Sequence, residues 1–224
     1  MAKLVWDQVG DRVYKTGVEQ AAIYPMESGG VYGEGEAWNG LTAVTESPSG
    51  AEPTALYAND KKYVELMSAE EFGGTIEAYT YPKGFAACNG EADAVAGLRL
   101  TQQTRTPFAM VYKSLLGNDT EGTKYGYELH VVYGARVKPS ETANNTVNDS
   151  PEAATMSWEF STTAVDVDGF QPTSHIVIDS TTVDADKLKA VEEKLYGTAE
   201  AGAKILMPNE IIALIKGEGG VAAG

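Results

Sequence analysis

The chain has 224 residues, 43% of them hydrophobic, and a formal net charge of −15 from 32 acidic and 17 basic residues. This charge argues against free binding to nucleic acid, because affinity for phosphate comes mainly from clustered Lys and Arg. No apolar run approaches the roughly 20 residues of a membrane helix, and the first residues lack the apolar core of a signal peptide. We therefore expect a soluble protein made in the cytoplasm.

Cys88 is the only cysteine, so an intrachain disulfide and a Cys-rich metal centre are both excluded. No histidine lies near Cys88 in the sequence, although either His130 or His175 could approach it in the fold. A buried or bystander thiol is therefore expected rather than a nucleophile. We expect no catalytic, cofactor-binding or metal-binding residues.

The first part of the chain is predicted to form short strands. Residues 12–15 and 21–24 form two of them, with Gly17 between, and residues 38–46 form a third. Residues 68–71 have the spacing of a capping box, which predicts one helical turn.

The segment 47–53 is predicted to be an exposed loop. Proline removes the hydrogen-bond donors that a central strand needs, and glycine adds chain freedom. Pro48, Gly50 and the charged Glu52 all lie in this segment.

Alternation of side chains resumes at residues 75–81, where Glu77 and Tyr79 lie on the face opposite Ile76. An exposed tyrosine face could lie under a second sheet or at a subunit interface. Residues 82–97 are acidic and rich in Gly and Ala, and they are predicted to form a loop.

Four further strands are predicted, in two pairs. Residues 98–103 and 107–113 form one pair with Arg105 between them, and residues 127–133 and 156–161 have the two-residue period of half-buried strands. Their polar faces carry Glu128, His130 and Glu159.

After a short strand at 175–179, the hydrophobic period changes to that of a helix. Asp184 is a predicted N-cap, Gly197 follows the helix end, and a second helix is predicted between Pro208 and Gly217. We expect one mainly β domain over residues 1–216, in which two packed β-sheets form a sandwich or half-barrel with a flanking C-terminal helix. Residues 217–224 are expected to form a flexible tail.

Several short segments of the sequence resemble the major tail proteins, or tail tube proteins, of long-tailed, non-contractile bacteriophages, particularly those of Gram-positive hosts. These segments are Gln102-Gln103-Thr104-Arg105, Gly117-Asn118-Asp119-Thr120-Glu121-Gly122, Gly126-Tyr127-Glu128-Leu129-His130 and Asn148-Asp149-Ser150-Pro151-Glu152, with Ala37-Trp38-Asn39-Gly40-Leu41-Thr42-Ala43-Val44, Glu46-Ser47-Pro48-Ser49-Gly50-Ala51-Glu52, Ser68-Ala69-Glu70-Glu71-Phe72 and Glu77-Ala78-Tyr79-Thr80-Tyr81-Pro82 upstream. The resemblance covers residues 4–208 and includes no catalytic signature.

The resemblance implies a virion structural protein with the tail-tube fold. Its subunits form rings, expected to be hexameric, that stack into the tube through which genome DNA leaves for the host. Expected partners are further copies of the chain, the tape measure protein, and the tail-tip and tail-terminator proteins, with assembly in the host cytoplasm. DNA would pass without sticking, and no membrane is involved.

Residue roles follow from this resemblance. A long loop between early strands helps to join successive rings in the family, so Pro48, Gly50 and Glu52 are candidates for subunit contacts, or for an ordinary surface loop. Arg105 could pair with a carboxylate of a neighbouring subunit or form a surface salt bridge. The loop around Pro151 adds Asp149 and Glu152 as further contact candidates.

The acidic residues on polar strand faces are candidates for the lumen of the tube. They are Glu77, Glu128 and Glu159. An acidic bore would repel DNA, whereas the alternative interpretation is that the acidic residues maintain solubility.

Two other classes of function remain open. A virion-associated carbohydrate-binding or adhesive β module would have exposed aromatics in one patch, whereas a tube subunit would bury them between subunits. An acid/base hydrolase needs only two suitably separated carboxylates. The sequence has no nucleophile elbow, zinc-binding His pair at helical spacing or phosphate loop that would favour an enzyme.

Overall fold

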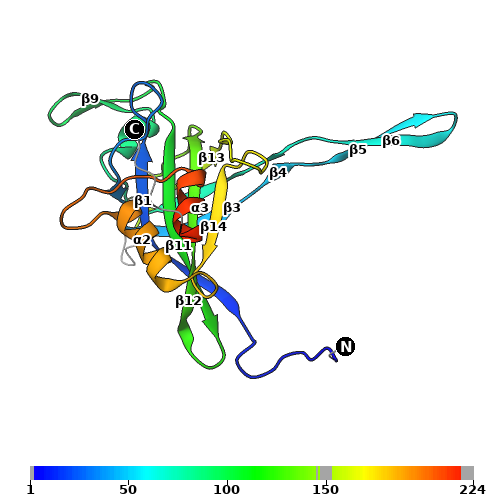
Figure 1. Cartoon of the computed structure of the whole chain (residues 1–224). Coiled ribbons are helices and arrows are strands. Elements are labelled where there is room, and N and C mark those ends of the chain that lie inside the picture. The colour runs from blue at the N-terminus through cyan, green and yellow to red at the C-terminus, as the bar shows by residue number, and fades with distance from the viewer. Residues whose placement is uncertain (1–2, 145, 147–152, 218–224) are drawn as a thin grey trace.

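The computed structural model describes residues 3–144, 146 and 153–217, and these residues form a mainly β fold with three helices (Figure 1). The large antiparallel sheet has the spatial order β2 (Glu36–Ala37), β1 (Tyr14–Pro25), β11 (Phe108–Asn118), β12 (Gly122–Val137), β13 (Met156–Ser161), β8 (Gly73–Ala78) and β3 (Leu41–Glu46), and β14 (His175–Asp179) also pairs with β12. Within the described residues the sheet is open, ending at β2 and β3.

Three two-stranded sheets and three helices complete the fold. The small sheets are β4 (Ser49–Gly50) with β7 (Glu70–Glu71), β5 (Pro53–Ala58) with β6 (Lys61–Met67), and β9 (Ala92–Val95) with β10 (Leu98–Leu100). The helices are α1 (Phe85–Cys88), α2 (Ala185–Tyr196) and α3 (Pro208–Lys216). Across the described ranges, no helix has the length and apolar character needed to cross a membrane.

The long strand β12 connects the two halves of the large sheet. One edge pairs with β11, while the other pairs first with β14 and then, at Arg136 and Val137, with β13. Gly134 lies between these two regions with φ +60, and a Cβ there would lie 2.5 Å from the Thr163 carbonyl oxygen. Glycine therefore permits the irregularity at which β12 changes partner.

One core, which we call the inner core, lies on the concave side of the sheet. Strands β1, β11, β12, β13 and β8 all contribute to it, and β3 approaches β1 across it. Its aromatic centre includes Trp38, whose ring centroid lies 4.5 Å from that of Phe85 and 5.7 Å from that of Trp158. The Trp38 indole N–H donates to the Thr80 carbonyl at 2.8 Å, so its polar atom is satisfied.

The opposite face of the sheet forms an outer core with α2 and α3. In β11 the successive residues Ala109 and Met110 point into the outer and inner cores respectively, as the two-residue period of a strand requires. In Figure 1 both helices lie across this face. Asp184 caps α2 by accepting hydrogen bonds from the Asp186 and Lys187 amides, and Gly217 ends α3 in the left-handed conformation, so both predicted caps are confirmed.

The mainly β class, the C-terminal helices and the strands near 38–46, 75–81, 127–133, 156–161 and 175–179 are confirmed. The two segments predicted at 12–15 and 21–24, by contrast, fall in one strand, β1, which begins only at Tyr14. Gly17 and Gln20 have positive φ at two register shifts in it. Bulges, rather than a turn, interrupt the pattern there.

Two local predictions are wrong because longer-range pairing prevails. Residues 68–71 do not form a helical turn, since Glu70 and Glu71 pair with β4. Segments 98–103 and 107–113 are not partners, because β10 pairs with β9, whereas β11 pairs with β1 and β12. The segment 82–97, predicted to be a loop, contains α1 and β9.

Cys88 is fully buried in the inner core, and burial raises the pKa of its thiol to about 12. We expect the native protein to react with a thiol reagent at mildly alkaline pH at least about 100-fold more slowly than an exposed cysteine, because the thiolate is the reactive form. The same reagent should titrate one thiol per chain in concentrated guanidinium chloride. Rapid labelling of the folded protein would contradict the buried position.

Candidate assembly surfaces

A hairpin projects from the body of the molecule and is here called the arm, residues 49–71. Figure 1 shows β5 and β6 extending away from the large sheet, with β4 and β7 at the base. At the tip, Asn59 and Asp60 have φ of +50 and +60, the signs required by a two-residue type I′ turn. The segment predicted as an exposed loop is therefore exposed, but it begins a two-stranded ribbon.

The arm carries apolar side chains that nothing in the described chain covers. Leu56 pairs with Val64, and Thr54 pairs with Leu66, so these four residues share one face, here called the aliphatic face. Leu56, Val64 and Leu66 are 44%, 39% and 55% exposed. An isolated two-stranded hairpin is marginally stable in water, and exposed apolar patches commonly mark interaction sites.

The base of the arm is fixed to the body by specific hydrogen bonds. The Ser47 amide donates to the Gly73 carbonyl at 2.8 Å, and the Thr162 hydroxyl donates to the Phe72 carbonyl at 2.6 Å. Both ends of the arm therefore leave the sheet from defined positions.

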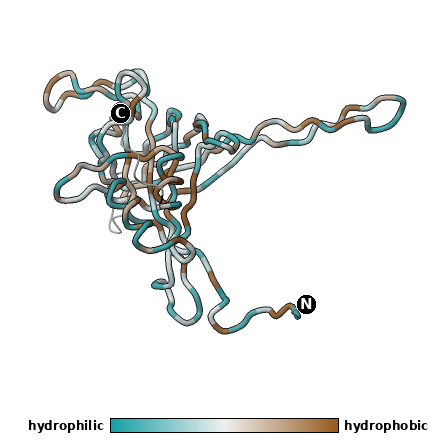
Figure 2. The backbone as a smooth tube through the Cα atoms, in the orientation of Figure 1, coloured by the Kyte–Doolittle hydropathy of each residue, from teal (hydrophilic) through white to brown (hydrophobic). Residues whose placement is uncertain are grey.

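The N-terminal segment forms a second extended apolar surface. Leu4, Val5, Trp6 and Val9 are exposed, and Figure 2 shows hydrophobic residues in this segment as well as along the arm. The Gly10 amide donates to an Asp119 carboxylate oxygen at 2.9 Å, which holds the segment against the turn between β11 and β12.

Two of the three lumen candidates lie on one sheet face. Glu77 pairs with Ser157 and Glu159 pairs with Thr75, so both glutamates project from the face opposite the buried Ile76 and Trp158. Glu159 is exposed and forms an ion pair with Lys138.

Glu128 lies on a different face from the other two candidates. It pairs with Ser114 and shares the inner face of β12 with His130. Its carboxylate is partly buried and lies 2.5 Å from the Lys15 ammonium.

The contact candidates have separate locations. Pro48, Gly50 and Glu52 are exposed at the base of the arm. Gly50 has φ +83, and a Cβ there would lie only 2.5 Å from the Ala69 carbonyl oxygen, so glycine is required where the arm begins. Asp149 and Glu152 lie outside the described residues.

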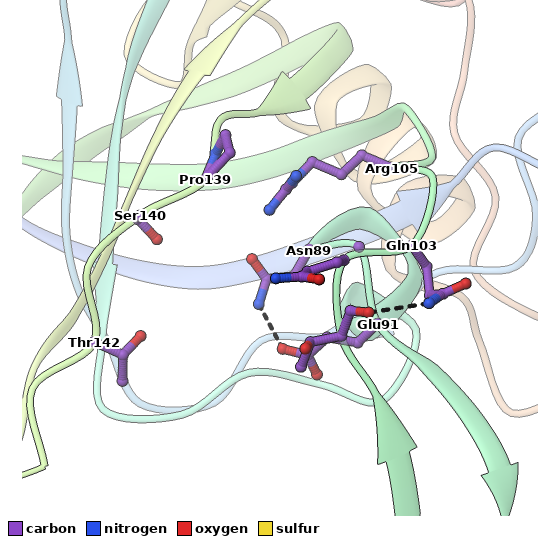
Figure 3. A pocket seen from close by; sticks show the side chains of 10 residues that line it. Asn89, Glu91, Gln103, Arg105, Pro139, Ser140 and Thr142 are labelled. Atoms are coloured by element: carbon purple, nitrogen blue, oxygen red, sulfur yellow. Dashed lines mark hydrogen bonds between the residues drawn. The ribbon is translucent and has the colours of Figure 1, made fainter.

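Arg105 lines a polar pocket of about 540 Å³. Figure 3 shows its side chain in the space between Pro139 and Asn89. Its Nε is buried and has no hydrogen-bond partner among the described residues, and no ion pair of Arg105 is seen there. Glu91, in the same pocket, pairs instead with Arg99 at 2.9 Å. A carboxylate from a neighbouring subunit therefore remains a prediction for Arg105.

A cluster that the sequence did not predict lies beside the base of the arm and is here called the histidine cluster: Glu46, His130 and His175. His130 Nδ1 lies 3.0 Å from His175 Nε2 and 3.2 Å from a Glu46 carboxylate oxygen. Burial lowers the pKa of His130 to about 4 and also lowers the pKa of His175, while the Glu46 charge opposes both changes. The two histidines are 45 residues apart, so no local motif could reveal their contact.

Comparison of the sequence with protein-family models and with curated proteins finds no match. The class that the fold and its surfaces define is a mainly β protein with a projecting hairpin arm and C-terminal helices on one sheet face.

The arm should exchange its backbone amide hydrogens much faster than the central strands. In the free subunit we expect β5 and β6 to be at least roughly 100-fold less protected than β11 and β12, because the arm has two exposed faces and opens locally. Hydrogen exchange read by mass spectrometry measures this difference. Equal protection of the arm and the central strands would show that the arm is already covered in the free protein.

Proposed function

We propose that the chain is the tail tube subunit of a long-tailed, non-contractile bacteriophage, of the type that infects Gram-positive hosts. The observation that carries the proposal is the arm, whose aliphatic face is exposed on a ribbon too small to be stable alone. The resemblance of residues 4–208 to major tail proteins supports the same conclusion, and it supplies the ring-and-tube arrangement.

Within this proposal the curved sheet corresponds to the sandwich or half-barrel of the tail-tube fold. The sheet surrounds the inner core and leaves β2 and β3 as its terminal strands. An open sheet edge can pair with another chain, and a closed ring of subunits satisfies every such edge. Lateral pairing of these edges would therefore close a ring, expected to contain six subunits.

The arm then joins one ring to the next, and its partner is a second copy of this chain. Its length allows it to reach beyond the sheet, while its fixed base sets the direction in which it leaves. Covering Leu56, Val64 and Leu66 in the next subunit removes apolar surface from water and stabilises the ribbon. The base residues Pro48, Gly50 and Glu52 would lie at the same axial contact.

The face that carries Glu77 and Glu159 is the proposed wall of the bore. Carboxylates on this face repel DNA phosphates and keep the passage free of adhesion. Glu128 is less suited to this role, because its carboxylate is partly buried and lies on the inner face of β12. The tube acts passively in the virion tail, assembled in the host cytoplasm around the tape measure protein and ended by tail-tip and terminator proteins.

One observation favours the alternative of an adhesive, carbohydrate-binding module on the virion. Tyr57 and Tyr63 on the arm are 72% and 78% exposed, and aromatic rings are common at binding surfaces. In a tube these rings become buried between subunits, whereas in an adhesin they stay exposed. Assembly therefore distinguishes the two functions.

Polar substitution on the aliphatic face should block stacking. We expect the wild-type chain to form hollow tubes or six-fold rings as its concentration rises, and Leu56→Thr with Leu66→Thr to stop at rings or monomers. Threonine is β-branched and favours strands, while it removes apolar contact area. Negative-stain electron microscopy and light scattering on the same samples measure the result.

A matched control uses the other exposed hairpin. Leu98 in β10 is 53% exposed and lies outside the arm, so Leu98→Thr should assemble as wild type does. Tubes formed equally well by the arm variant would contradict the role of the arm. Persistent wild-type monomers, even with tail-tip components added, would favour the adhesive module.

Reversal of charge on the proposed bore should make the tubes retain DNA. Glu77→Lys with Glu159→Lys places lysines on one sheet face, and we expect DNA binding that weakens steeply as salt rises. Glu193→Lys with Glu200→Lys makes the same charge change on the helix side, where both residues are exposed. Filter binding of labelled DNA to assembled tubes compares the variants, and equal retention by both would place the bore elsewhere.

A further inference from the structure

We propose that Glu46, His130 and His175 form a binding site for a divalent transition metal, with Zn²⁺ the best match to the ligand set. Each residue offers one ligand atom, and the three atoms all lie within 4.8 Å of one another. Two imidazole nitrogens and one carboxylate oxygen are a common set of protein ligands for catalytic-type zinc, which keeps its fourth position for water. The site does not depend on the proposed tail tube function.

Two of the three ligand-to-ligand distances are close to those that an ion requires. Zn–N and Zn–O bonds of about 2.0–2.1 Å place tetrahedral ligands about 3.3 Å apart. In the histidine cluster, His130 Nδ1 is 3.0 Å from His175 Nε2 and 3.2 Å from the Glu46 oxygen. The Glu46 oxygen and His175 Nε2 lie within 4.8 Å of each other without forming an ion pair, so these two side chains would draw closer together around a cation.

The two imidazole rings lie edge to edge, with these nitrogens pointing toward each other. Their planes differ by 9° and their centroids are 5.2 Å apart, close to the largest separation that a 3.0 Å nitrogen contact allows. Between two neutral rings, one of the facing nitrogens donates its proton to the other. When an ion binds, that proton would move to the second nitrogen of the same ring, so that both facing nitrogens coordinate and both rings stay neutral. The His175 ring would tilt to give tetrahedral geometry, which is feasible because it is only half-buried.

The surrounding residues already orient His130 as a ligand. Its second nitrogen, Nε2, lies 2.8 Å from the Ser114 hydroxyl oxygen and 3.5 Å from a Glu128 carboxylate oxygen. With Nδ1 on the metal, the Nε2 proton would face these two oxygens, as is usual around metal-bound histidine. The Tyr112 ring stacks on His130 at 4.5 Å, and its hydroxyl donates to Glu46 at 2.8 Å.

The electrostatic surroundings also suit a cation. Glu46 and Glu128 contribute two carboxylates, against the single ammonium of Lys15. Burial lowers the pKa of both histidines, so their nitrogens are neutral and able to coordinate at neutral pH. The Glu46 side chain is 39% exposed, which gives the ion a route from solvent and leaves space for a bound water.

Such a site would connect three strands at the base of the arm. Glu46 ends β3, His130 lies in β12, and His175 begins β14. On the returning side of the arm, the Phe72 ring lies 4.3 Å from the His175 ring. A bound metal would therefore fix both ends of the arm to the central sheet.

The test uses the full-length chain without an affinity tag, stripped with chelator and titrated with Zn²⁺ and, separately, Co²⁺. We expect one ion per chain by calorimetry, and a Co²⁺ visible spectrum typical of tetrahedral coordination. At a free Zn²⁺ concentration of about 100 times Kd, Tm should rise by roughly 5–10 °C. Mg²⁺, which prefers oxygen ligands, should not reproduce these effects.

Two variants test the ligands. His175→Gln and Glu46→Gln each remove one ligand without altering the buried His130, and each should weaken binding at least about 100-fold. Glu159→Gln removes an exposed carboxylate from the opposite face of the sheet and should bind as wild type does. Circular dichroism checks that the variants fold.

Failure of the stripped wild type to bind Zn²⁺ or Co²⁺ stoichiometrically would overturn the proposal. Undiminished binding by both folded ligand variants would also overturn it, because the ion would then lie elsewhere on this acidic chain. Neither result would affect tube formation, so the metal site and the proposed function can fail separately.

Discussion

The fold depends on one strand, β12, that must be covered on both faces and paired along both edges. Its alternate side chains enter different cores, with Val131 and Tyr133 toward the helices and Val132 toward the inner core. The helices are needed because the sheet face beneath them is apolar, and two tyrosines attach them to it. The hydroxyl of Tyr24 donates to the Leu195 carbonyl, and that of Tyr133 donates to the Leu206 carbonyl at 2.7 Å. These buried bonds fix where each helix lies.

Local sequence patterns predicted those parts of the fold whose causes are local. The alternation at 156–161 and the helix signals at Asp184 and Gly217 depend on neighbouring residues, and all three are confirmed. Strand partners could not be predicted in the same way. The residues of β10 satisfy their backbone groups with β9, a choice that depends on turn geometry at Gly97 rather than on the apolar pattern. A capping-box spacing likewise has no influence once β4 lies beside Glu70.

The arm shows why a correct prediction of exposure can miss a structure. Proline and glycine at 48–53 exclude a central strand, but they permit an edge strand in an isolated ribbon. Its turn is formed by Asn59 and Asp60, without the glycine that makes such turns easy to recognise. A paired ribbon loses less conformational entropy on binding than a disordered loop of the same length. An assembly contact made by the arm would therefore be partly organised before the next subunit arrives.

The histidine cluster and the arm share a structural cause. Because β12 pairs with β14 while β3 folds back over the inner core, His130, His175 and Glu46 converge from three distant segments where the arm leaves the sheet. Burying the His130 imidazole and half-burying that of His175 carries a desolvation cost that apolar residues would avoid. The partners of His130, which include Ser114 and Glu46, offset part of that cost. A polar cluster at this position can change its bonding when it gains a cation, whereas an apolar cluster cannot. The residues best placed to set the direction of the arm are therefore also the residues able to respond to a ligand.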